Sequence, residues 1–223
     1  LLERTNYALM RKSVILWVTL LLGCSPPPPP MPPAGMVLIP AGQSVLGADE
    51  PEAFFRPAAR IFVEAFYLDK TEVTHQQFAA WKPAHRYASA EGEYPVTHVT
   101  REEAVAYLAS QGKRLPRASE WERAARGSDG RRYPWGNEWD PSKGNLTENG
   151  RNHDDFCSLG RMKPVGSFPS GASPFGCLDM CGNAWEWVSD LKDGRPVIRG
   201  GAFGYRERDC RASSYATEDV GFT

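Results

Sequence analysis

Apolar and polar positions along the chain predict a few short elements separated by long irregular stretches. Met36 to Pro40 is an apolar run that ends in the turn residues Pro40-Ala41-Gly42, and it predicts a short buried strand. A second run, Ile61 to Tyr67, predicts another strand. Residues 127–201 show almost no periodicity, so this stretch is expected to consist mainly of loops.

Helices are predicted at three places, two of them in the first half of the chain. The first runs from Thr74 to Trp81, with Thr74 as its N-cap. Thr100 and Glu103 form a capping box, so a second helix starts at Thr100 and stops at Gly112. One face of this helix carries its apolar side chains, namely Ala104, Val105, Tyr107 and Leu108.

The third helix is expected from about Ala118 to Ala125, followed by Gly127. Arg117 stands at its N-cap, where a side-chain oxygen is normally needed. The start of this helix therefore loses roughly 1 kcal/mol unless Ser119 takes over the capping role.

The N-terminal part of the chain predicts export. Met10 resembles a translation start, which would make residues 1–9 an overrun of the gene. Two basic residues precede an apolar stretch, Val14 to Leu22, that is too short to span a bilayer, so residues 1–23 are expected to be a signal peptide. The stretch ends in a sequence that resembles a bacterial lipobox, in which Cys24 takes the lipid. An ordinary signal peptide with an incidental cysteine is the alternative.

Lipidation of Cys24 would make the chain a membrane-anchored lipoprotein of the bacterial cell envelope, in the periplasm or at the outer membrane. Residues 24–34 are rich in proline, which favours the extended polyproline II helix, so they are expected to form a stiff spacer. The remaining residues, 35–223, have the length of one domain. The net charge of −1 argues against nucleic acid as a partner. Besides the membrane, the expected partner is a protein or small molecule of unknown identity.

Six short motifs follow one another in a fixed order: Gly112–Pro116, Glu120–Gly127, Tyr133–Asn137, Pro164–Pro169, Gly182–Trp187 and Arg199–Gly201. In this order they resemble the formylglycine-generating enzyme, or sulfatase-modifying factor, family, from about Gly35 to Phe222. The resemblance implies an α+β, C-type-lectin-like fold that is rich in loops and has little regular secondary structure.

The resemblance also implies a calcium site between Asp179 and Glu186. The family binds one calcium ion through the side chain matching Asp179, the carbonyls matching Gly182 and Ala184, and the carboxylate matching Glu186. Calcium prefers several carboxylate and carbonyl oxygens, and these four positions are compatible with it. The alternative is that Glu186 only accepts hydrogen bonds from backbone N–H groups of the loop.

A second calcium site is implied by two further segments. Asn145 and Leu146 match a family asparagine and carbonyl, and Asp154 and Phe156 match an Asp-x-aromatic element. About three extra residues separate Phe156 from the next motif. The segment around Asp154 could equally be a solvated loop.

The positions that match the family's copper site are changed. In formylglycine-generating enzymes, two cysteines five residues apart follow the double glycine and bind copper(I); in this chain these positions are Tyr205 and Cys210. Ala202 replaces the active-site serine, and Asp209 replaces an aromatic residue. Because copper(I) selects soft thiolates, copper is not expected at this site.

Four cysteines remain after the signal peptide, and an oxidising compartment favours two disulfides among them. The resemblance favours Cys157–Cys177 and Cys181–Cys210, because the family fold brings the loop of Asn183 next to the double glycine. A zinc site built from all four thiolates is the rival interpretation, although it lacks a second Cys-x-x-Cys arm.

Three functions remain open. The leading hypothesis is a calcium-stabilised binding or accessory module whose oxidase chemistry is degenerate. The second is an oxidoreductase of the same family that uses an unfamiliar set of residues, such as Trp185, Tyr205, Arg206 and Glu207. The third is a purely structural envelope lipoprotein.

If Cys24 carries the lipid, Cys24→Ala should release the protein from the membrane fraction, because the apolar stretch before it cannot span a bilayer. Cell fractionation followed by immunoblotting measures this. A Cys24→Ala protein that stays full length and membrane-bound would refute the anchor.

Overall fold

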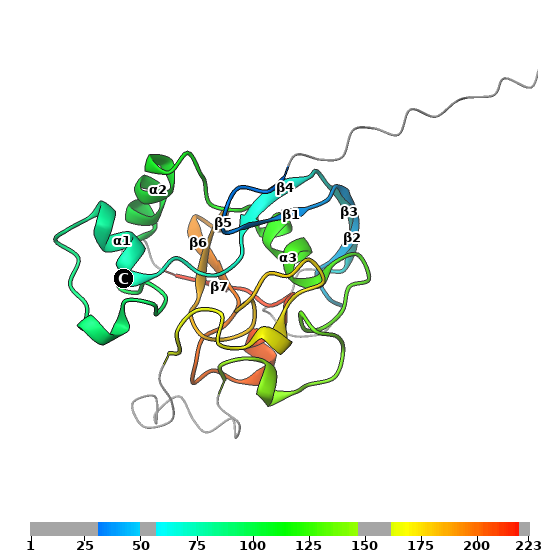
Figure 1. Ribbon diagram of the computed structural model, residues 1–223. Helices are drawn as coiled ribbons and strands as arrows, with labels where there is room; N and C mark the ends of the chain where they lie inside the picture. Colours follow the sequence, from blue (N-terminus) through cyan, green and yellow to red (C-terminus); the bar gives the residue numbers. More distant parts are fainter. Residues whose placement is uncertain (1–30, 50–56, 147–161, 219–223) are drawn as a thin grey trace, which may run out of the picture. The chain divides into compact units, whose positions relative to one another are not determined.

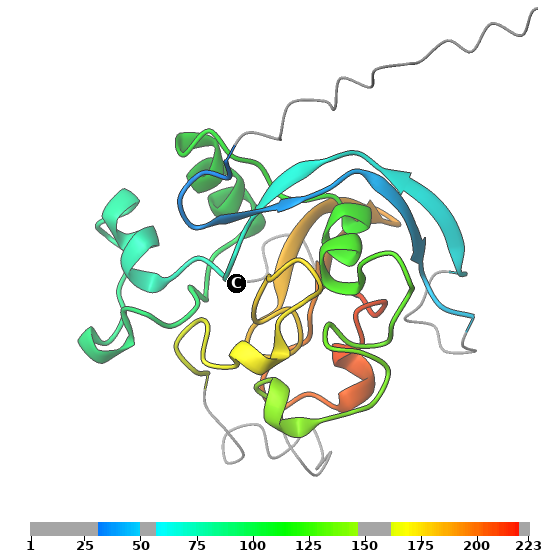
Figure 2. The same cartoon turned by 45° about the vertical axis from the view of Figure 1, so that its right-hand side comes forward.

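The computed structural model describes residues 31–49, 57–146 and 162–218. Two pairs of antiparallel strands form its N-terminal part: β1 (Met36–Ile39) pairs with β4 (Phe66–Asp69), and β2 (Gly42–Leu46) pairs with β3 (Ala59–Val63). Figure 2 shows these strands as one curved ribbon that passes over a helix, α3 (Ala118–Arg126). The predicted strand at Met36 is thereby confirmed.

The run Ile61 to Tyr67 is two strands and not one, so that prediction is wrong. Ile39 faces Phe66 and Gly42 faces Val63, which places Pro40-Ala41 opposite the break between β3 and β4. A proline has no N–H to donate to the ladder, so pairing is interrupted there on both sides.

The two predicted helices of the first half are confirmed. Helix α1 (His75–Trp81) has Thr74 as its N-cap, and α2 (Arg101–Ser110) begins with the capping box of Thr100 and Glu103. No residue of α2 is fully buried, and Val105 keeps 43% of its surface exposed. The apolar face of α2 is therefore not packed into the core.

Helix α3 starts and ends close to its predicted bounds, but its capping differs. The N–H of Ala118 donates to Oδ2 of Asp190 at 2.7 Å, and the N–H of Arg117 donates to Oε2 of Glu120 at 2.7 Å. Asp190, 72 residues away in the sequence, thus supplies the acceptor expected from Ser119. At the other end, Gly127 has φ of +68°, a conformation that favours glycine.

The C-terminal part contains a β-hairpin within the stretch that was expected to be loops. Strand β5 (Glu186–Lys192) pairs with β6 (Arg195–Arg199), which also pairs with the short β7 (Ala216–Thr217). Asp193 and Gly194 connect the first two strands with φ of +52° and +79°. The other regular elements among the described residues are short 3₁₀ turns, at Ser89–Glu91, Pro141–Lys143, Pro169–Gly171 and Glu207–Cys210.

Helix α3 lies at the centre of this arrangement, between the ribbon of β1–β4 and the β5–β6 hairpin (Figure 1). Trp121 of α3 is fully buried, and the main apolar core forms around it. The core also includes Ile39, Ala124, Met180, Val188, Val197 and Tyr215. None of the helices in the described part of the chain has the length and apolar character needed to cross a bilayer.

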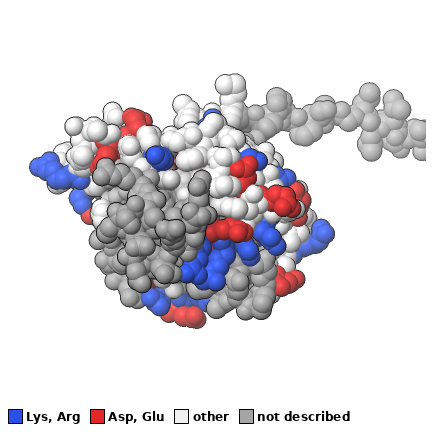
Figure 3. All heavy atoms as spheres, turned by 90° about the horizontal axis from the view of Figure 1, so that it is seen from below, with Lys and Arg blue, Asp and Glu red and all other residues white. Residues whose placement is uncertain are grey.

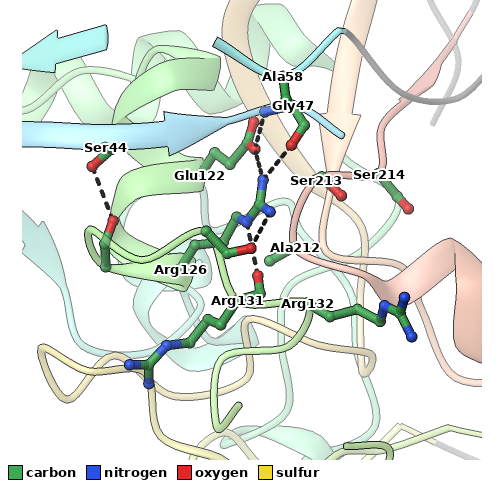
Figure 4. Close-up of polar contacts among 12 residues, drawn as sticks. Ser44, Gly47, Ala58, Glu122, Arg126, Arg131, Arg132, Ala212, Ser213 and Ser214 are labelled. Carbon is green, nitrogen blue, oxygen red and sulfur yellow. Dashed lines mark hydrogen bonds and ion pairs between the residues drawn. The ribbon is translucent and has the colours of Figure 1, made fainter. Parts of the chain in front are cut away.

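A buried network of charged side chains joins α3 to the rest of the fold (Figure 4). Glu122 pairs with Arg126 at 2.6 Å and with Arg199 at 3.1 Å, and it accepts the N–H of Gly47 at 2.6 Å. Arg126 donates back to the carbonyl of Gly47 at 2.7 Å. The side chains of Glu122, Arg126 and Arg199 are almost fully buried and so are shielded from water. Their ion pairs and hydrogen bonds with one another take the place of hydrogen bonds to water.

Glu122→Ala should lower the free energy of unfolding by about 3–5 kcal/mol, because it leaves two buried guanidinium groups without their carboxylate. Urea denaturation measures this. The matched control is Glu138→Ala on the surface, for which a change below about 0.5 kcal/mol is expected. Equal effects of the two substitutions would contradict a supporting role for the network.

Candidate functional site

The loop from Asp179 to Glu186 is held by one buried side chain. Asn183 accepts hydrogen bonds from Nδ2 of Asn145 and from the N–H of Lys163, both at 2.9 Å. Its own Nδ2 donates to Oε2 of Glu72 at 2.9 Å. The loop is therefore fixed to three segments that are distant in the sequence.

Two glycines allow segments that are distant in the sequence to approach each other closely around this loop. A Cβ on Gly182 would collide with the carbonyl oxygen of Asn145, and a Cβ on Gly201 would collide with Sγ of Cys210. Both glycines have positive φ, +87° and +76°. These contacts explain why two of the sequence motifs contain glycine at these places.

The calcium site implied by the resemblance stays a prediction, and the structure gives the surroundings of its residues. Oε1 of Glu186 and the carbonyl oxygen of Ala184 each lie 3.8 Å from the position where a Cβ on Gly200 would stand. Oε2 of Glu186 accepts from Nε1 of Trp121 at 2.9 Å, and Oδ2 of Asp179 accepts from the N–H of Gly166 at 2.6 Å.

The alternative role predicted for Glu186 was to accept hydrogen bonds from backbone N–H groups of its own loop. In the structure a different acid, Glu72, accepts such a bond. Oε1 of Glu72 accepts the N–H of Ala184 at 3.1 Å. Glu72 was not among the residues predicted for this site. The available signal was an acidic residue between an apolar strand and the helix cap Thr74, and by itself it pointed to no partner.

Three acids near this loop have raised pKa values. Burial raises the pKa of Glu186 to about 7, and the charge of Asp179 adds to the effect. Burial also raises the pKa of Asp179, and it raises that of Glu72 well above its usual range, with Glu186 and Asp179 contributing further. Within the described residues no ion pair to a lysine or arginine involves these acids.

Carboxylate and carbonyl oxygens are the ligands that calcium prefers, and among the described residues no basic side chain compensates these acids. The described residues contain no group of three or more His, Cys, Asp or Glu side chains placed to hold a metal. The ligand set implied at Asp179 and Glu186, two carboxylates and backbone carbonyls, therefore stays a prediction.

Only part of the predicted second calcium site lies within the described residues. Asn145 and Leu146 are described, whereas Asp154 and Phe156 lie outside the described residues. The carbonyl of Asn145 accepts the N–H of Asn183 at 3.1 Å. Asn145 thus helps to position the first loop.

The structure brings Cys181 and Cys210 into hydrogen-bonding contact as free thiols. Both are buried, with exposed fractions of 3% and 0%. Burial, and then Cys181, raise the pKa of Cys210. The disulfide between them stays a prediction that non-reduced peptide mapping can decide.

Cys177 belongs to the main core, away from this pair, and it also carries a free thiol. Burial raises its pKa to about 12. Its predicted partner, Cys157, lies outside the described residues. No three thiols form a metal cluster in the described part of the chain, so the four-thiolate zinc site is not supported.

The residues at the family's catalytic positions lie next to a cluster of aromatic side chains. Tyr205 meets Trp185 edge to face at 5.3 Å and packs against the cluster of Tyr133, Cys181 and Cys210. Ala202 is buried next to the double glycine. The structure therefore brings Ala202, Tyr205 and Cys210 together, but with one thiol and no hydroxyl at the positions where the family has two thiols and a serine.

Charged side chains nearby are largely paired. Arg211 pairs with Glu207 at 3.6 Å, and Arg131 pairs with Asp129 at 2.7 Å. Figure 3 shows basic and acidic side chains next to one another on the face seen from below. This face therefore carries both signs of charge.

The model of the Sulfatase-modifying factor enzyme 1-like domain matches residues 25–223. The chain belongs to this family. A solved structure with the same fold, PvdO from Pseudomonas aeruginosa, superimposes with a TM-score of 0.69 at 22% identity, over 84% of this chain and 89% of PvdO.

Among curated members of this family, hercynine oxygenase of Mycolicibacterium smegmatis is 32% identical over 69% of this chain and 45% of its own length. The formylglycine-generating enzyme of Bos taurus is 29% identical over 75% of this chain and 61% of its own length. The bovine inactive C-alpha-formylglycine-generating enzyme 2 is 43% identical over 44% of this chain and 33% of its own length. The chain thus spans only part of these relatives, and they differ in activity.

The raised pKa of Glu186 predicts a pH-dependent stability in calcium-free protein. The carboxyl ionises near 4.5 in the unfolded chain and near 7 in the folded domain. The folded state therefore holds more protons between these values, and stability should fall by about 3 kcal/mol as the pH rises through this window. Urea unfolding of wild type and Glu186→Gln in chelator checks this, and an equal pH slope in both proteins would contradict it.

Proposed function

We propose that this protein is a calcium-stabilised binding or accessory module of the sulfatase-modifying factor family, held at the membrane through Cys24, which does not form formylglycine. The observation that carries the proposal is the state of Cys210. It is fully buried beside Cys181, whereas Tyr205 stands at the position of its expected metal-binding partner.

The residues at the family's copper positions do not fit copper(I). A tyrosine hydroxyl is a hard and weakly acidic ligand, while copper(I) selects soft thiolates. Ala202 offers no hydroxyl group to a substrate. The family also includes a relative whose name describes it as inactive, so loss of activity within this fold has a precedent.

One observation favours the alternative, an active oxidoreductase with a non-standard site. Cys181 places a second thiol next to Cys210, so two soft ligands are adjacent although not at the family's positions. Their burial argues against catalysis, because a reacting substrate must approach the site. An assay for aldehyde formation distinguishes the two functions.

Calcium is supported by the uncompensated acids. Burial is the main cause that raises the pKa of Glu186, and the charge of Asp179 adds to it; a divalent cation between the two would offset both effects. The carbonyl oxygen of Ala184 lies next to Gly200, as Oε1 of Glu186 does, and would supply a further oxygen. The carbonyl of Gly182 is the fourth ligand that the resemblance implies.

Added calcium should raise the melting temperature of the wild type and leave that of Glu186→Ala unchanged, because ligand binding stabilises only a folded state that holds the site. Differential scanning calorimetry in chelator and in calcium checks this. Magnesium serves as the control cation, since it demands a tighter octahedral shell. A wild type without any response to calcium would refute the site.

Purified protein incubated with copper, oxygen and a cysteine-containing sulfatase peptide should give no aldehyde above a copper-only control. Mass spectrometry of the peptide measures this. The double variant Tyr205→Cys with Ala202→Ser is the informative comparison, since it restores the thiol and hydroxyl at the family positions. Turnover by the wild type would overturn the proposed function and favour the oxidoreductase.

A further inference from the structure

A cavity of about 790 Å³ lies between helix α2 and the body of the domain. Its walls come from β4, from the segment between α2 and α3, and from residues 184–187. Pockets of roughly 300–1,000 Å³ are typical of small-molecule sites. The cavity therefore has the size to hold a ligand.

The walls of this cavity are mainly apolar and strongly aromatic. Ala104, Tyr107 and Leu108 of α2 line it, which explains why this helix has an apolar face but no fully buried residue. A set of aromatic side chains also lines it: Phe66, Phe78, Trp185 and Trp187. The faces of such rings attract cations.

The charges that line the cavity do not cancel. Its two basic residues are already paired, Lys113 with Asp69 at 2.6 Å and Arg114 with Glu120 at 2.7 Å. Two further acids line it, Glu72 and Glu186, and no basic residue in the described part of the chain pairs with either.

Both surplus acids stand on the side of the cavity formed by the Asn183 loop. Glu72 bonds to Asn183 and Ala184, and Glu186 follows Trp185 in the chain. Aromatic faces and carboxylates thus meet in one apolar space. A buried carboxylate is costly unless a cation accompanies it.

We propose that this cavity binds a small organic cation, in which an ammonium group is carried on an apolar body. The ammonium group lies against Glu72 and the aromatic rings, and the apolar body lies along α2. This inference rests on the proposed binding function and names the class of its ligand.

An organic cation in the cavity is compatible with calcium at the neighbouring site. Calcium bound by Asp179 and Glu186 would be neutralised by these two carboxylates, which leaves Glu72 as the surplus acid of the cavity. A bound ammonium group would favour the ionised form of Glu72, whereas a neutral or an anionic ligand would not.

The test compares two probes of equal length, n-hexylammonium and n-hexanol, by isothermal titration calorimetry on the calcium-loaded protein at neutral pH. Hexylammonium should bind about tenfold more tightly, as expected for a desolvated cation next to aromatic rings. Equal affinities, or no binding of hexylammonium, would overturn the proposal.

Glu72→Gln should bring the affinity for hexylammonium down to that for hexanol. The matched control is Glu64→Gln, the same change at an exposed position, which should leave both affinities unaltered. An equal loss in the control would show non-specific attraction and overturn the proposal.

Glu72→Gln replaces one of the two carboxylate oxygens that accept hydrogen bonds from Asn183 and Ala184. A second variant is therefore needed in case the Glu72→Gln protein does not fold. Ala104→Phe fills part of the cavity from α2 and should weaken both probes, whereas unchanged binding would place them elsewhere and refute the site. Failure of this site is distinct from failure of the proposed function: aldehyde formation would overturn the function, while equal binding of both probes would overturn only the cation.

Discussion

The fold depends on buried polar side chains that bond to the backbone in place of regular secondary structure. Long loops leave N–H and C=O groups inside the domain, and such groups need partners. Arg126 donates to the carbonyls of Gly47 and Arg131, at 2.7 and 2.8 Å, and Arg199 reaches three consecutive carbonyls from Ala212 to Ser214. Each of these arginines therefore provides several backbone carbonyls with the hydrogen bonds that a regular strand or helix would otherwise supply.

This dependence explains which elements the sequence could predict. Helices α1 and α2 were predicted because their signals are local: Thr100 and Glu103 are three residues apart and cap each other. The acceptor for α3 could not be predicted, since Asp190 arrives from a strand 72 residues away. The β5–β6 hairpin was missed although Asp193-Gly194, an Asp-Gly pair between two apolar runs, is a strong hairpin signal.

The same contrast between local and long-range contacts applies to the candidate site. The resemblance implied that Asp179 and Glu186 bind one calcium ion, and this site stays a prediction. Glu72 accepts a hydrogen bond from Asn183 of the loop between these two acids, 111 residues away in the sequence. Nothing in the sequence around Glu72 indicates that Asn183 is its partner. The contact between Cys181 and Cys210 is also long-range, and it arises because Gly201 lets the two backbone segments approach closely.

One part of the described structure departs from the rule that buried charges have partners. Glu122 pairs with the guanidinium groups of two arginines. Glu72, Asp179 and Glu186 lie close enough to influence one another's charge, and none of them pairs with a described arginine or lysine. Natural folds keep such uncompensated groups mainly where function requires them. The cost of burying these acids falls when a cation binds, so the domain without a cation should be less stable than the bound one. With the two proposed ligands, calcium at the loop and an organic cation in the adjoining cavity, the same acids would link the stability of the fold to the binding of positive charge.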